Sequence, residues 1–304
     1  MTFYPLVSIV IPTHNRKNKL VKLINSIKNS NYPQEKIEVI VIDDASTDNT
    51  REVVNELFPD IILLHNSIEK LPSTCRNLGI KNSSADYLLL VDDDNILDEN
   101  TLKDLISILT SHNQIGLVGP VSYYDQEREK IWCAGGKINA PLFVTTHVFQ
   151  NHRFDDLHGT KIIEVDYVPN AFMVKKEIFT DLQFFDTDLP LGWEEIDLAL
   201  RIRKKGYKVI VNTTAKVFHD VSFAQDVHIT EKRAYWRGRN RTIFFRKHSP
   251  IRCCFLFLDI IGFLFLLVKL KGNLKYFSQY IKGVGNGLVT ELSKISCLSF
   301  QVYN

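Results

Sequence analysis

The chain has 304 residues, of which 45% are hydrophobic and 24% are charged, so its composition excludes a disordered chain and suffices for one large domain with or without an extension. Residues 230–304 carry 13 Lys and Arg against 3 Asp and Glu, whereas the rest of the chain carries 24 against 32. The basic C-terminal segment, next to an acidic remainder of the chain, predicts an anionic partner, either a membrane surface or a nucleic acid.

The first 120 residues alternate between apolar runs and amphipathic stretches. Helices are predicted from Asn18, from Ser46 or Thr47, from Pro72, and over 99–110. Strands are predicted at 7–11, 37–42, 61–64, 87–91 and 117–121. This alternation predicts right-handed βαβ units and a mostly parallel sheet. We interpret the apolar run at 7–11 as a strand, so we expect no signal peptide at the N-terminus. The five cysteines show no spacing typical of a disulfide framework, which favours a reducing location that faces the cytoplasm.

The alternation of strands and helices stops between residues 122 and 165, where glycines and scattered aromatics suggest hairpins or a long loop. Beyond it we expect short strands at 165–168 and 171–174, a helix over 193–204 and a strand at 207–211.

An apolar run covers residues 253–268 and is interrupted only by Asp259 and Gly262. A spanning helix needs about 20 predominantly apolar residues, so this run is short for one. Basic residues flank it on both sides, which favours a helix lying in the membrane interface. A buried helix and a spanning helix are the alternatives.

Three carboxylates, Asp92, Asp93 and Asp94, directly follow the buried run at 87–91. In open α/β sheets, ligands bind beyond the carboxyl ends of the strands. Adjacent carboxylates repel one another, a bound cation relieves that repulsion, and hard oxygen ligands suit Mg²⁺ or Mn²⁺. A solvated acidic turn is the alternative interpretation.

Four further features converge on this turn. Residues 12–16 end the first strand, residues 43–48 end the second, residues 76–79 lie on the helix before the acids, and residues 193–198 begin a later helix. His219 ends a later strand, so acids and a histidine are expected at one edge of one sheet.

The motifs "VSIVIPTHNR", "VIDDASTDNT", "CRNLGI", "LLLVDDDN" and "GWEEIDLALRIRKKGYKV" occur in this order over roughly residues 5–220. In this the chain closely resembles the family 2 glycosyltransferases of the GT-A fold. The resemblance implies an α/β catalytic domain over 1–225, with a Rossmann-like, mostly parallel sheet flanked by helices. Residues 226–304 then form a helical, membrane-associating extension. It also implies a nucleotide-diphosphate sugar donor, Mn²⁺ or Mg²⁺, and inversion at the anomeric carbon.

The resemblance assigns roles residue by residue. Asp94 first and Asp92 second match the metal-binding acids, and His219 matches a histidine that in some members completes the metal shell or contacts phosphate. Asp44 matches an acid that accepts a hydrogen bond from the base, which favours UDP- or dTDP-sugars. The nucleotide-binding set is Pro12, Thr13, Asn15, Asp44, Arg76, Asp92 and Asp93.

Glu195 matches the catalytic base. The pair here is Glu194-Glu195, where many relatives have Glu-Asp, so Asp197 remains a competitor for that role. Trp193, Glu194 and Asp197 are candidates for the acceptor side.

A looser resemblance links the chain to enzymes of surface polysaccharides and lipid-linked glycans, including rhamnosyltransferase-like members. We therefore expect a hexosyl- or deoxyhexosyl-transferase with a glycan or lipid-linked acceptor, held peripherally on the inner face of the membrane. A catalytically inactive nucleotide-sugar-binding subunit is the alternative. A nucleic-acid-binding protein is disfavoured, because nucleic acid would not use the apolar run.

Overall fold

The structure is a computed structural model that describes residues 4–139, 144–157, 159–221, 230–249, 254–269 and 274–301. Its contacts divide the chain into two compact units. The sheet unit comprises Met1–Ile138, Thr145–Asp186 and Glu195–Val221, and the helical unit comprises Asn139–Val144, Thr187–Glu194 and Ser222–Asn304. The predicted domain boundary at residue 225 lies outside the described residues.

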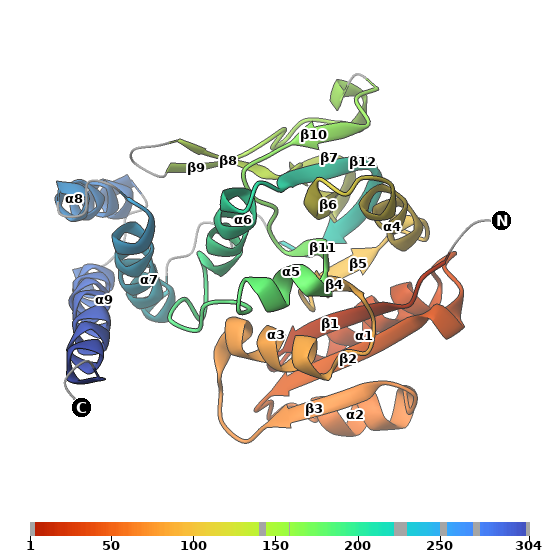
Figure 1. The fold of residues 1–304 in the computed structure, drawn as a ribbon, viewed down its shortest axis with the longest axis horizontal. Coiled ribbons are helices and arrows are strands. Elements are labelled where there is room, and N and C mark those ends of the chain that lie inside the picture. The colour runs from red at the N-terminus through yellow and green to blue at the C-terminus, as the bar shows by residue number, and fades with distance from the viewer. Residues whose placement is uncertain are drawn as a thin grey trace. The chain divides into compact units, whose positions relative to one another are not determined.

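The sheet unit is built on a ten-stranded sheet in the order β10-β12-β6-β11-β4-β1-β2-β3, with β5 paired to β12 and β7 paired to β6 (Figure 1). The strands are β1 Val7–Thr13, β2 Ile37–Asp44, β3 Ile62–Asn66, β4 Tyr87–Val91, β5 Asn95–Leu97, β6 Ile115–Tyr124, β7 Glu127–Cys133, β10 Ile162–Glu164, β11 Ala171–Lys175 and β12 Lys208–His219. A separate pair is formed by β8 Gly136–Asn139 and β9 Val144–His147.

Six strands run in one direction. β1 lies parallel between β2 and β4, and β2 and β3 are also parallel. β11 is antiparallel to both β4 and β6, so β6 and its parallel partner β12 share the direction of β4. The carboxyl ends of these strands therefore meet at one edge, and the chain reverses its strand order beside β1, where open α/β sheets bind ligands.

Helices cover both faces of this sheet (Figure 1). They are α1 Lys17–Lys28, α2 Thr50–Leu57, α3 Leu71–Asn82, α4 Thr101–Ser111, α5 Lys176–Asp181 and α6 Glu194–Lys204. One apolar core contains side chains of α1, α2 and α4, and the other contains side chains of α3, α5 and α6. β1 alternates between them, with Ile9 and Ile11 in the first core and Val10 in the second, as expected for a strand buried on both faces.

Several predicted elements differ from the structure, and the strand expected at 207–211 continues to His219 as part of β12. The expected strand at 165–168 is irregular, because the ladder with β12 ends at Glu164 and Tyr167 then forms an isolated bridge to Gly136. The second helix begins at Thr50 rather than near Ser46, because Asp48 accepts hydrogen bonds from the Lys17 backbone N–H and the Thr50 hydroxyl. Those bonds tie this loop to the loop that follows β1.

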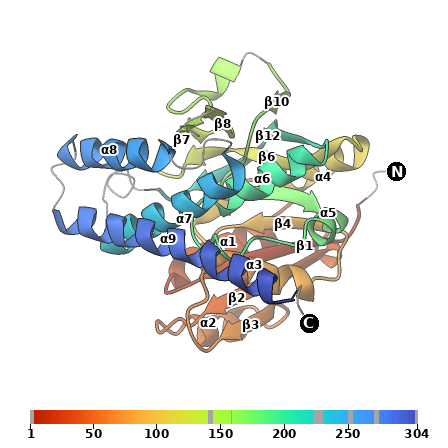
Figure 2. The ribbon, with the colours of Figure 1, turned by 60° about the vertical axis from the view of Figure 1, so that its left-hand side comes forward.

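Among the described residues, the helical unit contains the helices α7 Glu231–His248, α8 Cys254–Lys269 and α9 Leu274–Gln301. α9 runs alongside α7 (Figure 2). Glycines permit the approach, since a Cβ on Gly283 would lie 2.1 Å from the Tyr235 carbonyl oxygen and one on Gly238 would lie 2.2 Å from the Tyr280 carbonyl oxygen. The two backbones therefore touch where larger residues would separate them.

α8 contains most of the apolar run predicted from the sequence. Its one acid, Asp259, faces inward and pairs with Arg241 of α7 and the Tyr280 hydroxyl of α9. Phe265 and Val268 are 76% and 78% exposed, and Ile261 and Leu264 are also exposed. Their spacing of three and four residues places these four side chains on one helix face. In the part of the chain that the structure describes, no helix has the length and apolarity needed to cross a bilayer.

Candidate functional site

The acidic turn lies where β4 ends. β11 pairs with β4 so that Ala171 faces Val91, which places Asn170 beside the turn. The Asp92 N–H donates to the Asn170 carbonyl at 2.9 Å, and the Asn170 side-chain amide donates to Asn95 at 2.7 Å. Asn170 has a φ of 59°, a left-handed conformation that asparagine tolerates better than most residues. The turn is thus braced from the antiparallel strand next to it.

Asp93 is buried and points toward the loop after β1. One carboxylate oxygen accepts a hydrogen bond from the Thr13 hydroxyl at 2.7 Å, and the other lies 3.0 Å from the Arg16 guanidinium. Burial raises the pKa of Asp93 to about 6, although Arg16 favours the charged form. These two contacts join the loop after β1 to the turn after β4.

Asp94 lies between two cationic or potentially cationic groups. Its Oδ2 is 2.9 Å from Arg16 Nη1, and its Oδ1 is 3.3 Å from His219 Nε2. Burial opposes ionisation of this carboxyl, but His219 and Arg16 outweigh burial and lower its pKa to about 2. His219 comes from the end of β12, in register with Asn95, and Trp132 packs edge-on against its ring at 4.4 Å.

Asp94 and His219 are suited to bind a divalent cation whose coordination shell is completed by the substrate. His219 Nδ1 is buried and makes no hydrogen bond with any described residue, and Asp94 Oδ1 is buried beside the other ring nitrogen, Nε2, at 3.3 Å. An oxygen and a nitrogen at this separation can share a cation. Within the described ranges no group of three His, Cys, Asp or Glu side chains is arranged to hold a metal. Mg²⁺ in enzymes commonly takes one or two carboxylates and draws its other ligands from substrate phosphates and water.

Arg76 links two predicted acids. It is buried on α3, and its Nη2 lies 2.5 Å from Asp92 Oδ1 and 3.2 Å from Glu195 Oε1. Glu195 Oε1 also accepts the Asn170 backbone N–H at 3.1 Å. The predicted nucleotide cation, a predicted metal acid and the predicted base therefore form one continuous network.

Asp44 is buried at the end of β2 and accepts three hydrogen bonds. Its donors are the Asn66 side-chain amide and the backbone N–H groups of Lys70 and Leu71, each at 2.8 Å. A carboxylate offers about four acceptor sites, so these three bonds fix the position of Asp44.

The loop after β1 is locked to the loop after β2. Asn15 has a φ of 54°, and its backbone N–H donates to the Ser46 hydroxyl at 2.9 Å. Its side-chain oxygen accepts the Thr47 backbone N–H at 2.7 Å. Pro12 and Thr13 end β1 in the same region and are buried.

The three acceptor-side candidates have different surroundings. The Trp193 ring lies 4.8 Å from the Phe244 ring and 5.0 Å from the Arg241 guanidinium. Glu194 is buried at the start of α6. Asp197 is buried and lies 2.7 Å from Arg201 Nε.

Sequence reasoning missed Arg16, Asn66 and Asn170 as members of this network. Arg16 is the last residue of the motif "VSIVIPTHNR", but its partners Asp93 and Asp94 are 77 and 78 residues away in sequence. Asn66 ends β3 and Asn170 directly precedes β11, and at such strand ends a polar side chain is equally common in a plain turn.

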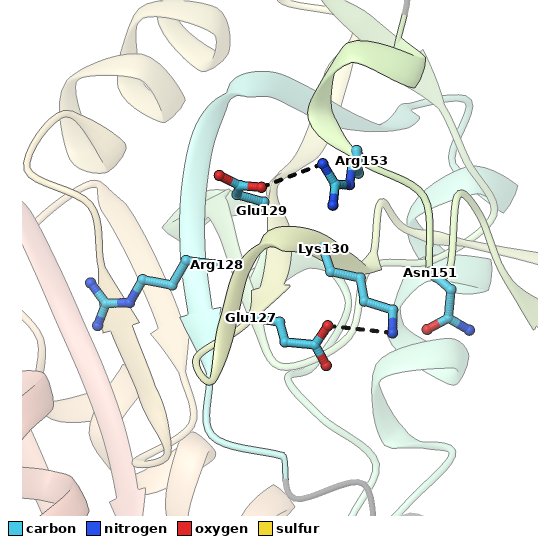
Figure 3. Close-up of a pocket in the computed structure, with 6 residues that line it drawn as sticks. All are labelled: Glu127, Arg128, Glu129, Lys130, Asn151 and Arg153. Carbon is cyan, nitrogen blue, oxygen red and sulfur yellow. Dashed lines mark ion pairs between the residues drawn. The ribbon is translucent and has the colours of Figure 1, made fainter.

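A polar pocket of about 470 Å³ lies on the hairpin that contains β7 (Figure 3). Its lining residues are Glu127, Arg128, Glu129, Lys130, Asn151 and Arg153. Lys130 pairs with Glu127 and Arg153 pairs with Glu129, each at 3.6 Å. Arg128 points away from the others in Figure 3 and lies 4.3 Å from the centre of the Phe218 ring, next to His219 in the chain. None of the predicted site residues lines this pocket.

Comparison with known proteins identifies a family that this chain matches. The model of glycosyl transferase family 2 matches residues 8–182. Poly(ribitol-phosphate) beta-N-acetylglucosaminyltransferase TarS of Staphylococcus aureus strain Mu50 is 30% identical over 109 residues, which are 35% of this chain and 19% of TarS. The chain spans 60% of another relative, glycosyltransferase GlyG of Streptococcus pneumoniae, at 24% identity over 190 residues and 59% of this chain. The chain therefore spans less than two thirds of the length of these curated relatives.

The fold is shared with a solved glycosyltransferase. Mannosyltransferase PcManGT from Pyrobaculum calidifontis, in complex with GDP-Man and Mn²⁺, superposes with a TM-score of 0.58 at 17% identity. The match covers 98% of this chain and 81% of that one. At this identity the likeness establishes the fold, and the GT-A fold predicted from the motifs is confirmed.

Proposed function

Because the chain belongs to glycosyl transferase family 2, we propose that it transfers a sugar from a nucleotide-diphosphate donor to a hydroxyl group of a glycan or lipid-linked acceptor. The observation that carries this proposal is the network at one sheet edge. Asp94 and His219 offer a place for a cation on the donor phosphates, and Glu195 offers a base, with Arg76 joining Asp92 to Glu195.

The donor site is proposed to lie along the carboxyl ends of β1, β2 and β4. Asp44 would accept a base N–H such as N3–H of uracil or thymine, which is why UDP- or dTDP-sugars are favoured. Pro12, Thr13 and Asn15 would line the nucleotide, with Asp92 and Asp93 near its ribose and phosphates. The mannosyltransferase neighbour was solved with GDP-Man, so a donor panel must also include guanine nucleotides.

Asp94 and His219 are the proposed metal ligands, with Asp92 as the secondary acid. Mn²⁺ or Mg²⁺ is the proposed ion, and the neighbouring mannosyltransferase was solved with Mn²⁺. When bound, this ion would supply positive charge to the diphosphate leaving group. Arg76, buried near the same acids, would add a fixed positive charge on the donor side.

Glu195 is the proposed base of a single displacement. Its carboxylate would take the proton of the acceptor hydroxyl while the acceptor oxygen bonds to C1 and the bond from C1 to the phosphate oxygen breaks. One displacement inverts the configuration at C1. Arg76 and the Asn170 N–H would hold the carboxylate in place. The Asp197 side chain is 3% exposed and lies 2.7 Å from Arg201, whereas that of Glu195 is 17% exposed and lies 3.2 Å from Arg76, so the more accessible and less tightly paired Glu195 is favoured as the base. Trp193 and Glu194 are proposed on the acceptor side.

The proposed location is the inner face of the membrane, bound peripherally. The helical unit belongs to the part of the chain with 13 Lys and Arg against 3 Asp and Glu, a balance that suits an anionic lipid surface. Its helix α8 presents exposed apolar side chains on one face.

A donor screen tests the proposed activity. Release of nucleotide diphosphate is measured with UDP-, dTDP- and GDP-sugars, with and without Mn²⁺, because such enzymes hydrolyse their donor slowly without an acceptor. We expect release with at least one donor, dependent on Mn²⁺ and abolished by Asp94→Ala. The matched control is Asp60→Ala, which removes an exposed carboxylate from the same unit. Release by Asp94→Ala at the wild-type rate would refute the metal assignment.

A further inference from the structure

We propose that Arg16 is a built-in counter-cation of the acidic turn, so that a divalent cation is taken up together with the nucleotide diphosphate and only weakly without it. This inference rests on the proposed function, because it concerns the same metal and donor site. It assigns Arg16 a positioning and regulatory role.

The geometry places one positive charge on two acids. Arg16 Nη1 lies 3.0 Å from Asp93 Oδ1 and 2.9 Å from Asp94 Oδ2. The second oxygen of Asp93 is bound by the Thr13 hydroxyl, so Asp93 holds Arg16 from a fixed position. The contact with Asp94 uses the oxygen opposite the one that faces His219. Arg16 therefore shares Asp94 with the candidate metal site and leaves its Oδ1 accessible to that site.

The charges at the site then determine how tightly the metal binds with and without the diphosphate. A divalent cation that binds Asp94 comes within a few ångströms of the guanidinium, and two cations at such a distance repel each other strongly. The described residues provide no three-ligand group that would offset this repulsion. A nucleotide diphosphate brings at least two negative charges and additional oxygen ligands, which offset the charge of Arg16. Free metal should therefore bind weakly, and metal with diphosphate should bind well.

The start of α1 depends on the backbone of Arg16 and not on its guanidinium. Arg16 is the N-cap residue of α1, but its side chain makes no capping hydrogen bond, and its carbonyl oxygen accepts the Lys19 and Leu20 N–H groups. Its side chain is 47% exposed. Replacing the guanidinium by a neutral amide therefore changes the charge beside Asp94 and leaves the helix start intact.

The test measures Mn²⁺ binding by the electron paramagnetic resonance signal of the free ion, with the full chain, in the presence and absence of UDP. Arg16→Gln removes the charge, and Arg16→Lys keeps it. Lys22→Gln removes an exposed charge from the same helix and serves as the matched control. Without UDP, we expect Arg16→Gln to bind Mn²⁺ about tenfold more tightly than wild type, and the other two variants to resemble wild type. The gain in Mn²⁺ affinity on adding UDP should shrink by the same factor in Arg16→Gln.

The contrary outcomes separate the two proposals. If UDP promotes Mn²⁺ binding to wild type but Arg16→Gln behaves as Lys22→Gln does, this inference is wrong and the metal site stands. Weaker Mn²⁺ binding by Arg16→Gln would also overturn it, because Arg16 would then orient Asp94 rather than oppose the ion. If none of UDP, dTDP and GDP promotes Mn²⁺ binding in wild type, or if Asp94→Asn binds Mn²⁺ with and without nucleotide as wild type does, the metal assignment itself fails.

Discussion

At the scale of single residues, Glu195 is held by contacts that a base requires. Arg76 and the Asn170 N–H both reach its Oε1, and α6 begins one residue before it. Glu195→Gln keeps the shape of the side chain but cannot take a proton. We expect this variant to transfer sugar about 10² to 10⁴ times more slowly while its KM for the donor stays within a few-fold of wild type. Steady-state kinetics with the donor found in the screen measure both values.

The control for that variant is Glu56→Gln, which removes an exposed carboxylate of α2. A Glu195→Gln enzyme as fast as Glu56→Gln would exclude Glu195 as the base. Asp197→Asn would then be the next variant to measure, although its pairing with Arg201 predicts a loss of stability rather than of turnover alone.

Glu38 gives a prediction for the opposite edge of the sheet. It accepts hydrogen bonds from the hydroxyl groups of Ser8 and Ser84 and from the Ser84 N–H, and so joins β1, β2 and the turn before β4. Burial opposes its ionisation, but these hydrogen bonds outweigh burial and lower its pKa below the ordinary value of 4.5. A lowered pKa stabilises the fold above the unfolded value, and that stabilisation is lost as pH falls through the folded value.

Glu38→Gln should therefore reduce the free energy of unfolding by about 1–2 kcal/mol at pH 7. The difference from wild type should shrink as the pH falls below about 4. Urea denaturation at pH 7 and at successively lower pH measures it. A difference that stays constant down to pH 3 would show that the charge of Glu38 contributes nothing.

At the scale of elements, the acidic turn shows what a sequence can and cannot predict. β4 was predicted with its observed bounds, because an apolar run buried on both faces has a clear length and its end is marked by charge. Asn170 was missed because its position depends on β11 entering antiparallel between β4 and β6. Local periodicity contains no information about which strands become neighbours. The same reason hid Arg16, whose partners belong to a different loop.

The pairing of α7 and α9 supplies a matched test within one helix. A Cβ on Gly283 would meet backbone atoms of α7, whereas a Cβ on Gly285 would meet nothing within 4 Å. Gly283→Ala should destabilise the helical unit by about 1–3 kcal/mol, since backbone atoms cannot move aside as a flexible side chain can. Gly285→Ala should be neutral or stabilising by up to about 1 kcal/mol through helix propensity. Thermal unfolding followed by circular dichroism compares the two, and equal effects would contradict the close packing.

At the scale of the whole molecule, the chain combines an acidic sheet unit with a basic helical unit. The exposed face of α8 is the proposed lipid contact, since Asp259 is turned inward and the outward side chains are apolar. Phe265→Glu combined with Val268→Glu should lower binding to vesicles containing phosphatidylglycerol by at least about tenfold, because burial of each apolar side chain is worth about 1.5–3 kcal/mol. Co-sedimentation with those vesicles and with neutral phosphatidylcholine vesicles measures it.

The control for the vesicle experiment is Ile68→Glu, since Ile68 is 60% exposed in the sheet unit. Equal binding by the double variant and Ile68→Glu would exclude the α8 face as the lipid contact. Light scattering of the same samples would show whether the face instead joins two copies of the chain.

The central claim is that one sheet edge holds a donor diphosphate and a single base, Glu195, for one displacement at C1. The most direct test is the anomeric configuration of the free sugar released from the donor identified in the screen. Proton NMR reads this configuration before the sugar mutarotates. The account predicts a product of inverted configuration from wild type and about 10² to 10⁴ times less of it from Glu195→Gln. A product that retains the donor's configuration would contradict the account, because a single displacement from the face opposite the leaving group inverts the configuration at C1.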